Sequence, residues 1–487
     1  MVVSGGARFL VLNVLYYHSM AKKKLKEASS NSLNKSLEKR KRITPLKIFT
    51  FDSLIKKFHD VIETFPDGRA SNISKSLKDA ALGGFSLFYT QNPSFLAYQK
   101  SMQKRKGKNN ATNLFGIGDI LSENQIRNIL DNVAPSYVLP MFSHVLDGLN
   151  YSGYLHRFRS FNGNLVVALD GTQFFSSKKV HCPNCHESLH SNGSITYSHS
   201  VVTPVLVKPG VKKAISLLPE FITPQDGHNK QDCENAAAKR WLTAYGSTLK
   251  SLGVTITGDD LYSKQPLCQT ILEQGLDFIL VCKEEDHKTL YEYVNFLKED
   301  IKTVVVTRWE GQKHLTDTYR FLNQVPLRDG KDALEVNWCE WVTTEKTSKG
   351  DKVIYRNTFV TNFVINEENV ADIAADGRVR WKVENENNNV LKTKGYHLEH
   401  SFGHGVKYLS NLLLTFNLLA FLFHTVLDLM DQKYKLIRRE LPTRKTFFQD
   451  LRALTRYTCF DSWDALLRFM IEGLELEVPQ VNIVDTS

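Results

Sequence analysis

Cysteine is scarce in this sequence, with seven residues among 487. A small, odd number of cysteines argues against a disulfide scaffold and favours a reducing compartment. Compositional bias is also absent, at 42% hydrophobic and 23% charged residues, and we find no internal repeat. This balance excludes collagen-like, disordered and coiled-coil classes, and the length predicts about two to three domains with a large buried core.

Uninterrupted apolar stretches of membrane-spanning length are missing. Residues 408–430 come nearest, but polar side chains including His424 and Asp428 interrupt them, so we expect a buried amphipathic helix of a soluble core. The shorter apolar stretch 9–17 lacks the small-residue cleavage site of a signal peptide. Met20 opens a basic segment, and we expect it to be the natural initiator, with the residues before it an upstream read-in.

Acidic residues are scarce in the first quarter of the chain. Residues 1–110 hold 21 Lys and Arg against 7 Asp and Glu, a formal charge of +14, whereas the remainder carries −4. A basic arm on a slightly acidic body suggests a polyanionic partner, although a solvated, charged terminus would have the same composition. The basic runs 22–24 and 104–106 are the candidate phosphate contacts.

Changes of pattern divide the chain into six regions. They are a basic, flexible N-terminus (1–47), a helical DNA-binding region (48–160), the first part of an α/β core (161–298), a β-rich insertion (299–365), the second part of the core (366–432) and a C-terminal helical region (433–487). In the helical region apolar residues recur every three or four positions, and Ser122 with Gln125 forms a capping-box pattern. Residues 94–110 begin as a helix and are expected to end as a basic loop.

Strand and helix patterns alternate in the expected core. Strands are predicted over 164–169, 196–207, 211–218, 254–257 and 277–282, and helices over 235–252 and 264–275. The insertion contains only strand patterns, over 303–309, 313–322, 334–344 and 353–365. Helical patterns return over 366–375 and 379–394.

Two acids follow short hydrophobic strands. Asp170 comes after the first core strand and Asp259 after the strand at 254–257. Ligand sites of α/β proteins lie at such strand ends, and converging carboxylates can hold hard divalent cations for phosphoryl transfer. A strand-end aspartate can equally well only cap a turn.

A third acid is expected from the helix at 379–394. Glu384 shares a face with Arg380 four residues earlier, and Lys392 lies about two turns further on. A carboxylate flanked by cations suits a site for metal and phosphodiester, although a solvated salt bridge has the same pattern. Glu386 and Glu399 are the competing candidates.

Four blocks of the chain resemble bacterial insertion-sequence transposases of the DDE, RNase H-like class, in particular the group filed as "not classified yet" (ISNCY). They are VALDGTQFFSS, LPEFITPQDGHNKQDCENAAAKR, GDDLYS and GRVRWKVENENNNVLKTKGYHLEHSFGHG, at 167–177, 218–240, 258–263 and 377–405. The segment DGRASN at 67–72 also fits. The resemblance covers roughly residues 50–430 and implies an RNase H-like core interrupted by a β-rich insertion.

The resemblance assigns roles by position. Asp170, Asp259 and Glu384 match the three catalytic acids that bind Mg²⁺ or Mn²⁺, with Asp260 as the alternative to Asp259. Arg380 and Lys392 match the basic partners of the related Tyr-Arg-Glu-Lys signature.

The chain departs from the family pattern at three positions. Gly377 stands in place of the tyrosine, Lys392 follows Glu384 by eight residues rather than seven, and Asn388 replaces an aromatic residue.

The insertion contains three tryptophans, Trp309, Trp338 and Trp341, which have two interpretations. They are either part of the β core or, where exposed, able to stack on a flipped base.

A Cys-x-x-Cys motif lies just after the first core strand. Cys182 and Cys185 form a zinc half-site that His190, His199 or Cys233 would complete. The alternative is a metal-free hairpin between the first two core strands. A thioredoxin-like role is disfavoured, because the motif does not open a helix after a strand.

The sequence therefore predicts a DDE transposase that cleaves and transfers DNA strands at the ends of an insertion sequence. A transposase-derived DNA-binding protein without catalysis and an RNase H-like nuclease are the alternatives. The expected partners are the terminal inverted repeats and target DNA, with a homodimer in the DNA complex. The expected location is the bacterial cytoplasm, at the nucleoid and without a membrane.

Overall fold

The computed structural model describes residues 49–70, 74–224, 230–441 and 443–477. The predictions made for residues 1–47, including Met20 and the basic run 22–24, lie outside this part of the chain. So do the predictions for residues 71–73, within the DGRASN segment.

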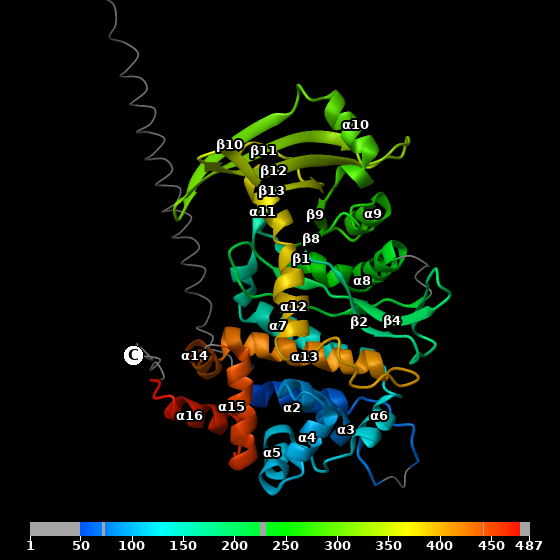
Figure 1. The fold of residues 1–487 in the computed structure, drawn as a ribbon, viewed down its shortest axis with the longest axis vertical. Coiled ribbons are helices and arrows are strands. Elements are labelled where there is room, and N and C mark those ends of the chain that lie inside the picture. The colour runs from blue at the N-terminus through cyan, green and yellow to red at the C-terminus, as the bar shows by residue number, and fades with distance from the viewer. Residues whose placement is uncertain (1–48, 71–73, 225–229, 442, 478–487) are drawn as a thin grey trace, which may run out of the picture. The chain divides into compact units, whose positions relative to one another are not determined.

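A nine-stranded mixed sheet forms the centre of the described structure (Figure 1), in the order β10-β11-β12-β13-β9-β8-β1-β5-β6. β1 runs parallel to β8, and β8 parallel to β9, whereas β5 and β6 continue antiparallel from β1. The predicted α/β class is confirmed. The five core strands of this sheet are β1 (Leu165–Ala168), β5 (Val205–Val207), β6 (Ile215–Ser216), β8 (Val254–Gly258) and β9 (Asp277–Val281).

The core strands have apolar residues on both faces because both faces are covered. Every residue of β1 and β8 is buried, as expected for central strands of a covered sheet. The strand predicted over 196–207 divides at Pro204, which has no backbone N–H for a ladder. The strand predicted over 211–218 is reduced to β6. A turn at residues 208–211, with Gly210 at positive φ, ends only a few residues before β6 begins.

A second, smaller sheet continues the first two core strands outward. β2 (Gly171–Ser177) follows β1 almost directly, and β4 (Ile195–Val202) leads into β5. β2 and β4 pair antiparallel, and β3 (His186–Leu189) and β7 (Glu220–Phe221) flank β4. The hairpin expected after Asp170 is therefore present, and it extends well beyond the central sheet.

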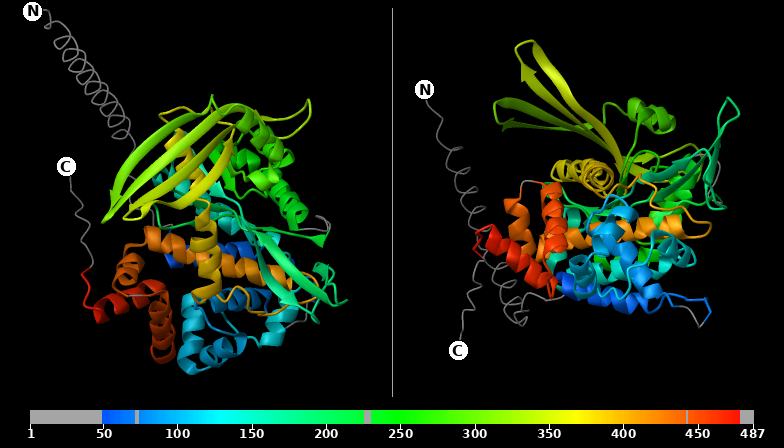
Figure 2. Two further views of the ribbon diagram at one scale, coloured as in Figure 1. Left: turned by 45° about the horizontal axis from the view of Figure 1, so that its top comes forward. Right: turned by 60° about the horizontal axis from the view of Figure 1, so that its bottom comes forward.

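The predicted β-rich insertion is not a separate sheet. Its strands form one antiparallel array, and β13 pairs with β9, so that the array extends the central sheet. Figure 2 shows these long strands running on from the sheet. Trp338 and Trp341 belong to the core, whereas Trp309 is 70% exposed. The strands are β10 (Lys302–Glu310), β11 (Lys313–Pro326), β12 (Glu335–Thr347) and β13 (Gly350–Thr361).

Helices cover the sheet and build the rest of the core. Those before the sheet are α2 (Phe51–Ile62), α3 (Leu77–Tyr89), α4 (Phe95–Met102), α5 (Arg105–Phe115), α6 (Glu123–Leu130) and α7 (Leu139–Tyr151). Those between and after the strands are α8 (Lys230–Leu252), α9 (Gln265–Glu273), α10 (Lys288–Phe296), α11 (Val370–Arg378), α12 (Asn389–Thr393), α13 (Leu409–Met430), α14 (Gln432–Glu440), α15 (Arg444–Tyr457) and α16 (Trp463–Gly473).

Helix α13 is the apolar segment that approaches spanning length. It contacts α3, α6 and α7 as well as β6 and α14, and 89% of its most apolar window is buried inside the protein. The prediction of a buried core helix is confirmed, but the helix is buried on all sides rather than amphipathic. Its buried His424 has two partners, the Tyr396 hydroxyl and the Tyr89 carbonyl.

Two details of the helical region bear on the predictions. The capping box of Ser122 and Gln125 is present at the start of α6. The predicted basic loop is wrong, because residues 104–106 form the N-cap and first turn of α5, with all three side chains exposed.

Asp131, at the end of α6, holds the start of α13. Its carboxylate accepts hydrogen bonds from the backbone N–H groups of residues 406, 407, 408 and 409 at 2.9–3.1 Å. Burial opposes ionisation, but these hydrogen bonds lower the pKa of Asp131. The side chain thus satisfies N–H groups that the helix itself leaves unpaired.

We predict that Asp131→Ala lowers the free energy of unfolding by about 1–2 kcal/mol, because the four backbone N–H groups at the start of α13 lose their acceptor. Urea unfolding measures this change. Asp60→Ala is the control, since the Asp60 side chain is 62% exposed and its loss should cost less than about 0.5 kcal/mol. Equal stabilities of the two variants would contradict the capping role.

Candidate metal centres

The register of the central sheet brings Asp170 and Asp259 side by side. β1 and β8 are parallel, and Ala168 is paired with Thr257. Asp170 and Asp259 each follow two residues later, beyond the same edge of the sheet. Because neighbouring strands lie about 4.8 Å apart, the two carboxylates leave adjacent positions on the backbone.

Asp170 sits in a polar but crowded environment. Asn388 donates from Nδ2 to Oδ2 of Asp170 at 2.7 Å, and Thr203 fixes the Asp170 carbonyl through its backbone N–H at 2.9 Å. Burial, followed by the charges of Glu384, Glu234 and Asp259, raises the pKa of Asp170 to about 7, whereas the charge of Arg380 opposes the shift. Several carboxylates therefore act on one another here, as in sites that bind cations.

Glu384 comes from a π-helical segment rather than from the predicted α-helix. Residues 383–388 form π-helical turns directly before α12, a rare geometry that is often found at functional sites. Glu384 is the carboxylate with the strongest effect on the pKa of Asp170. Arg380 donates from Nη1 to Oε1 of Glu384 at 2.6 Å, as the spacing of four predicts.

The π-helical segment also accounts for the spacing of Lys392. Two α-helical turns contain about seven residues. A π-helical turn, in which hydrogen bonds join residues five apart, contains about one residue more than an α-helical turn. Lys392, eight residues after Glu384, thus returns close to the same face. Its ammonium is paired with Glu399 at 2.9 Å.

Glu234 is an acid of this cluster that the sequence analysis missed. It is buried on α8, and its Oε2 lies 3.4 Å from the Tyr262 hydroxyl. Its carboxyl lies so close to Gly171 that a Cβ there would be 2.4 Å from Glu234 Cδ. The residue lies inside the second resemblance block, but it does not follow a strand, which was the signal used for Asp170 and Asp259.

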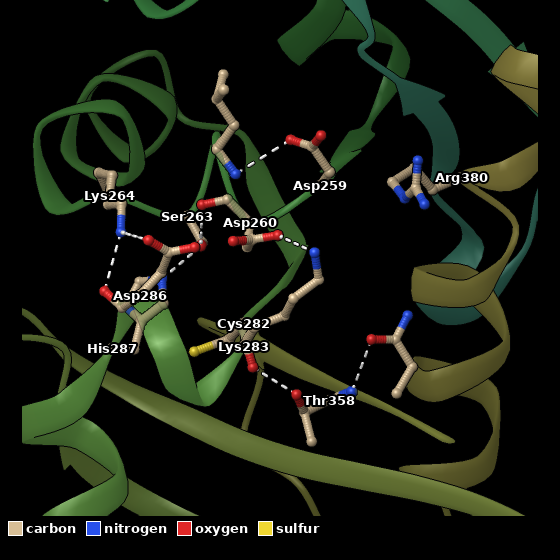
Figure 3. A network of polar contacts seen from close by, with 12 residues as sticks. Asp259, Asp260, Ser263, Lys264, Cys282, Lys283, Asp286, His287, Thr358 and Arg380 are labelled. Carbon is tan, nitrogen blue, oxygen red and sulfur yellow. Dashed lines mark hydrogen bonds and ion pairs between the residues drawn. The ribbon is translucent and has the colours of Figure 1, made fainter. Parts of the chain in front are cut away.

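The competing acids have other partners. Asp260 is paired with Lys283 at 2.9 Å, and Figure 3 shows these two side chains pointing toward each other while Asp259 points away from them. Burial opposes the shift, but hydrogen bonds from Asp286 and Lys283 lower the pKa of Asp260. Glu399 is engaged by Lys392, and the charge of Glu386 acts on Lys382.

The departure at Gly377 has a steric cause. Gly377 lies in α11 where the helix meets the sheet, and a Cβ there would be 2.5 Å from the Phe359 ring and 2.9 Å from Ile279. A tyrosine at this position does not fit the packing of this chain.

A separate Cys/His cluster lies on the hairpin of β2 and β4. The ligand atoms of Cys182, Cys185, His199 and His404 all lie within 4.8 Å of one another. The predicted Cys182, Cys185 and His199 are thus brought together. His190 is not part of the cluster, because its Nε2 lies 2.7 Å from the Thr196 hydroxyl on the exposed end of the hairpin.

His404 completes the cluster from a distant part of the sequence. It precedes α13 and lies more than two hundred residues after Cys185, so spacing could not reveal it. Its position in the last resemblance block, between two glycines, was the available signal. Cys233, the other residue weighed for this site, is instead 3.2 Å from His186 Nε2.

No protein-family profile matches the chain, and no curated protein matches it. The sequence motifs and the geometry of the two clusters therefore carry the functional assignment.

We predict that Asp170→Asn stabilises the metal-free protein. The pKa of Asp170 is about 3.9 in the unfolded chain and is raised to about 7 in the folded protein. The free energy of unfolding therefore falls as the pH rises from about 3.9 through 7, because the folded protein must then accept a charge on Asp170. Asparagine removes this charge and can still accept from Asn388. In the presence of EDTA, the variant should gain on the order of 2 kcal/mol at pH 8 and less at pH 5.

Thermal melts at the two pH values measure this difference. Adding Mg²⁺ at pH 8 should raise the melting temperature of the unmodified protein and not that of the variant. A variant that is less stable than the parent at pH 8 would contradict repulsion among these acids.

Proposed function

We propose that the chain is a DDE transposase with an RNase H-like core, which cleaves and transfers DNA strands at the ends of an insertion sequence. What supports the proposal is the placement of Asp170 and Asp259 at adjacent parallel strand ends, with the charges of Asp259 and of the helical Glu384 both acting on Asp170. Strand ends of this kind are where α/β sheets hold ligands.

The strand order supports the RNase H-like assignment. The five core strands lie side by side in the order β6-β5-β1-β8-β9. β6, β5 and β1 are antiparallel neighbours, and β8 and β9 continue the sheet parallel to β1. When the five core strands are numbered by their order in the chain, this spatial order is 3-2-1-4-5, the arrangement expected of an RNase H-like sheet. The β-rich segment enters after β9 and ends before α11, between the second acid and the third, where the related transposases carry an insertion.

The acids fit divalent cations of the hard, oxygen-binding type. Asp170, Asp259 and Glu384, with Glu234 beside them, would hold Mg²⁺ or Mn²⁺, and carboxylates are the ligands these ions prefer. Burial is the main cause of the raised pKa of Asp170, and the charges of Glu384, Glu234 and Asp259, which such ions would neutralise, add to it. Bound ions would supply activation of the attacking oxygen and stabilisation of the leaving oxygen.

The chain's own residues position these acids. Asn388 is buried, donates to Asp170, and itself accepts from the Thr203 hydroxyl at 3.1 Å. The residue that replaces the family's aromatic therefore has a place in an ordered network, which argues against a decayed site. Arg380 holds Glu384 and leaves a cation beside the acids, where a phosphodiester would lie.

DNA is the proposed partner, as terminal inverted repeats and as target, with two copies of the chain in the complex. Affinity for DNA comes mainly from phosphate contacts by Lys and Arg. The exposed basic residues 104–106 on α5 are available for such contacts. Trp309, exposed on the insertion and set edge-on to His314 at 4.9 Å between ring centroids, is available for stacking on a base.

We predict that Asp170→Asn lowers the rate of strand cleavage at least about 100-fold and changes the affinity for DNA by less than about threefold. The carboxylate would hold metal, whereas phosphate contacts supply the affinity. Nicking and gel-shift assays on one preparation, with a duplex carrying the gene's terminal repeats, measure both. Glu384→Gln should behave in the same way.

The matched control is Asp260→Asn, one residue from Asp259 but paired with Lys283. It should retain most of the cleavage activity. Parallel loss of binding and cleavage in Asp170→Asn would contradict the division of roles, and binding without metal-dependent cleavage in the unmodified protein would point to the DNA-binding alternative.

We predict that changing Lys104, Arg105 and Lys106 to Gln flattens the dependence of log K on log salt for DNA binding, by nearly one unit for each phosphate that the variant no longer neutralises. Fluorescence anisotropy over a salt series measures the slope. Changing the exposed Lys298 and Lys331 to Gln is the control and should alter the slope less. An unchanged slope in the α5 variant would identify the run as a solvated helix end.

A further inference from the structure

The Cys/His cluster has the dimensions of a tetrahedral metal site. The two sulfurs lie 3.9 Å apart and the His199 and His404 Nε2 atoms 3.2 Å apart. Nε2 of His199 lies 3.5 Å from the Cys182 sulfur and 3.4 Å from the Cys185 sulfur, and Nε2 of His404 lies 3.3 Å from the Cys185 sulfur. With Zn–S of about 2.3 Å and Zn–N of about 2.0–2.1 Å, tetrahedral zinc requires separations of about 3.8 Å between sulfurs, 3.3 Å between nitrogens and 3.5 Å between nitrogen and sulfur. These five distances match a tetrahedron around one ion, and all four ligand atoms lie within 4.8 Å of one another.

Neighbouring groups prepare the ligands for metal binding. His404 directs Nδ1 to the Gly405 carbonyl at 2.9 Å, which fixes its proton on Nδ1 and leaves the Nε2 lone pair for a metal. The Cys182 backbone N–H donates to Cys185 Sγ at 3.4 Å and so holds the two cysteines in one turn. Phe174 stacks on the His199 ring, and Phe175 contacts the His404 ring, so apolar side chains flank the ligands.

We propose that Cys182, Cys185, His199 and His404 bind one structural Zn²⁺. Two thiolates and two neutral imidazoles cancel the charge of the ion, which suits a buried position. Thiolate ligands select zinc over Mg²⁺, so this centre is chemically distinct from the acid cluster.

The zinc would tie together two parts of the chain. Cys182, Cys185 and His199 belong to the hairpin, whereas His404 belongs to the loop before α13. The same loop is held to α6 by Asp131, and the hairpin's Asn184 donates to the Lys407 carbonyl at 2.9 Å. The ion thus links the sheet that carries Asp170 to the helical region.

The distance from the acids indicates a structural role. His199 lies four residues before Thr203, which holds the Asp170 carbonyl, and four strand residues span about 13 Å. The zinc would fix the outer half of the hairpin whose inner end positions Asp170, and it would take no part in the phosphoryl chemistry.

Metal analysis of the full-length protein without a His tag tests the proposal. We expect about one equivalent of zinc per chain, as for a closed structural site, and its release by a thiol-modifying reagent. Cobalt exchanged into the site should give the visible spectrum of tetrahedral Co²⁺ with thiolate ligands. Less than about half an equivalent of zinc, or octahedral cobalt, would overturn the proposal.

Two substitutions at the distant ligand and one on the hairpin sharpen the test. His404→Asn should lose zinc and lower the melting temperature, whereas His404→Cys should keep zinc because it supplies another ligand. His190→Asn, on the same hairpin but outside the cluster, should keep a full equivalent. Zinc retained by His404→Asn, or lost equally from His190→Asn, would show that these four residues are not the ligands.

Discussion

Burial of the Asp170 carboxyl beside other acids, at one edge of the central sheet, is the constraint on which the site depends. Asp170 and Asp259 follow adjacent parallel strands, and burial, together with the charges of Glu384, Glu234 and Asp259, raises the pKa of Asp170 to about 7. The surrounding structure holds the acids in place, through Asn388 on Asp170 and through Arg380 on Glu384.

The larger elements serve the same arrangement. The hairpin of β2 and β4 begins at Asp170, and its Cys/His cluster is tied to the loop that leads into α13. Helix α13 packs between the helical region and β6, and Asp131 holds its first turn. The acids therefore lie on a scaffold whose parts are connected at several points.

Much of the fold followed from local pattern, because buried parallel strands leave continuous apolar runs and Asp170 and Asp259 stand at their ends. Features set by tertiary contact were out of reach. The π-helical segment around Glu384 has no signal in an otherwise ordinary helical pattern. Glu234 is identified only by its closeness to Gly171 in the folded protein, and His404 joins its cluster from more than two hundred residues away. The error at residues 104–106 arose because a basic run was taken for a loop although lysine and arginine favour helices.

Mn²⁺ soaked into crystals of the protein and located by anomalous scattering tests the central claim most directly. The account predicts two ions about 4 Å apart, both in contact with Asp170, one with Asp259 and the other with Glu384. Ions bound instead at Asp260, Glu386 or Glu399, or no ion at the Asp170 carboxylate, would contradict it.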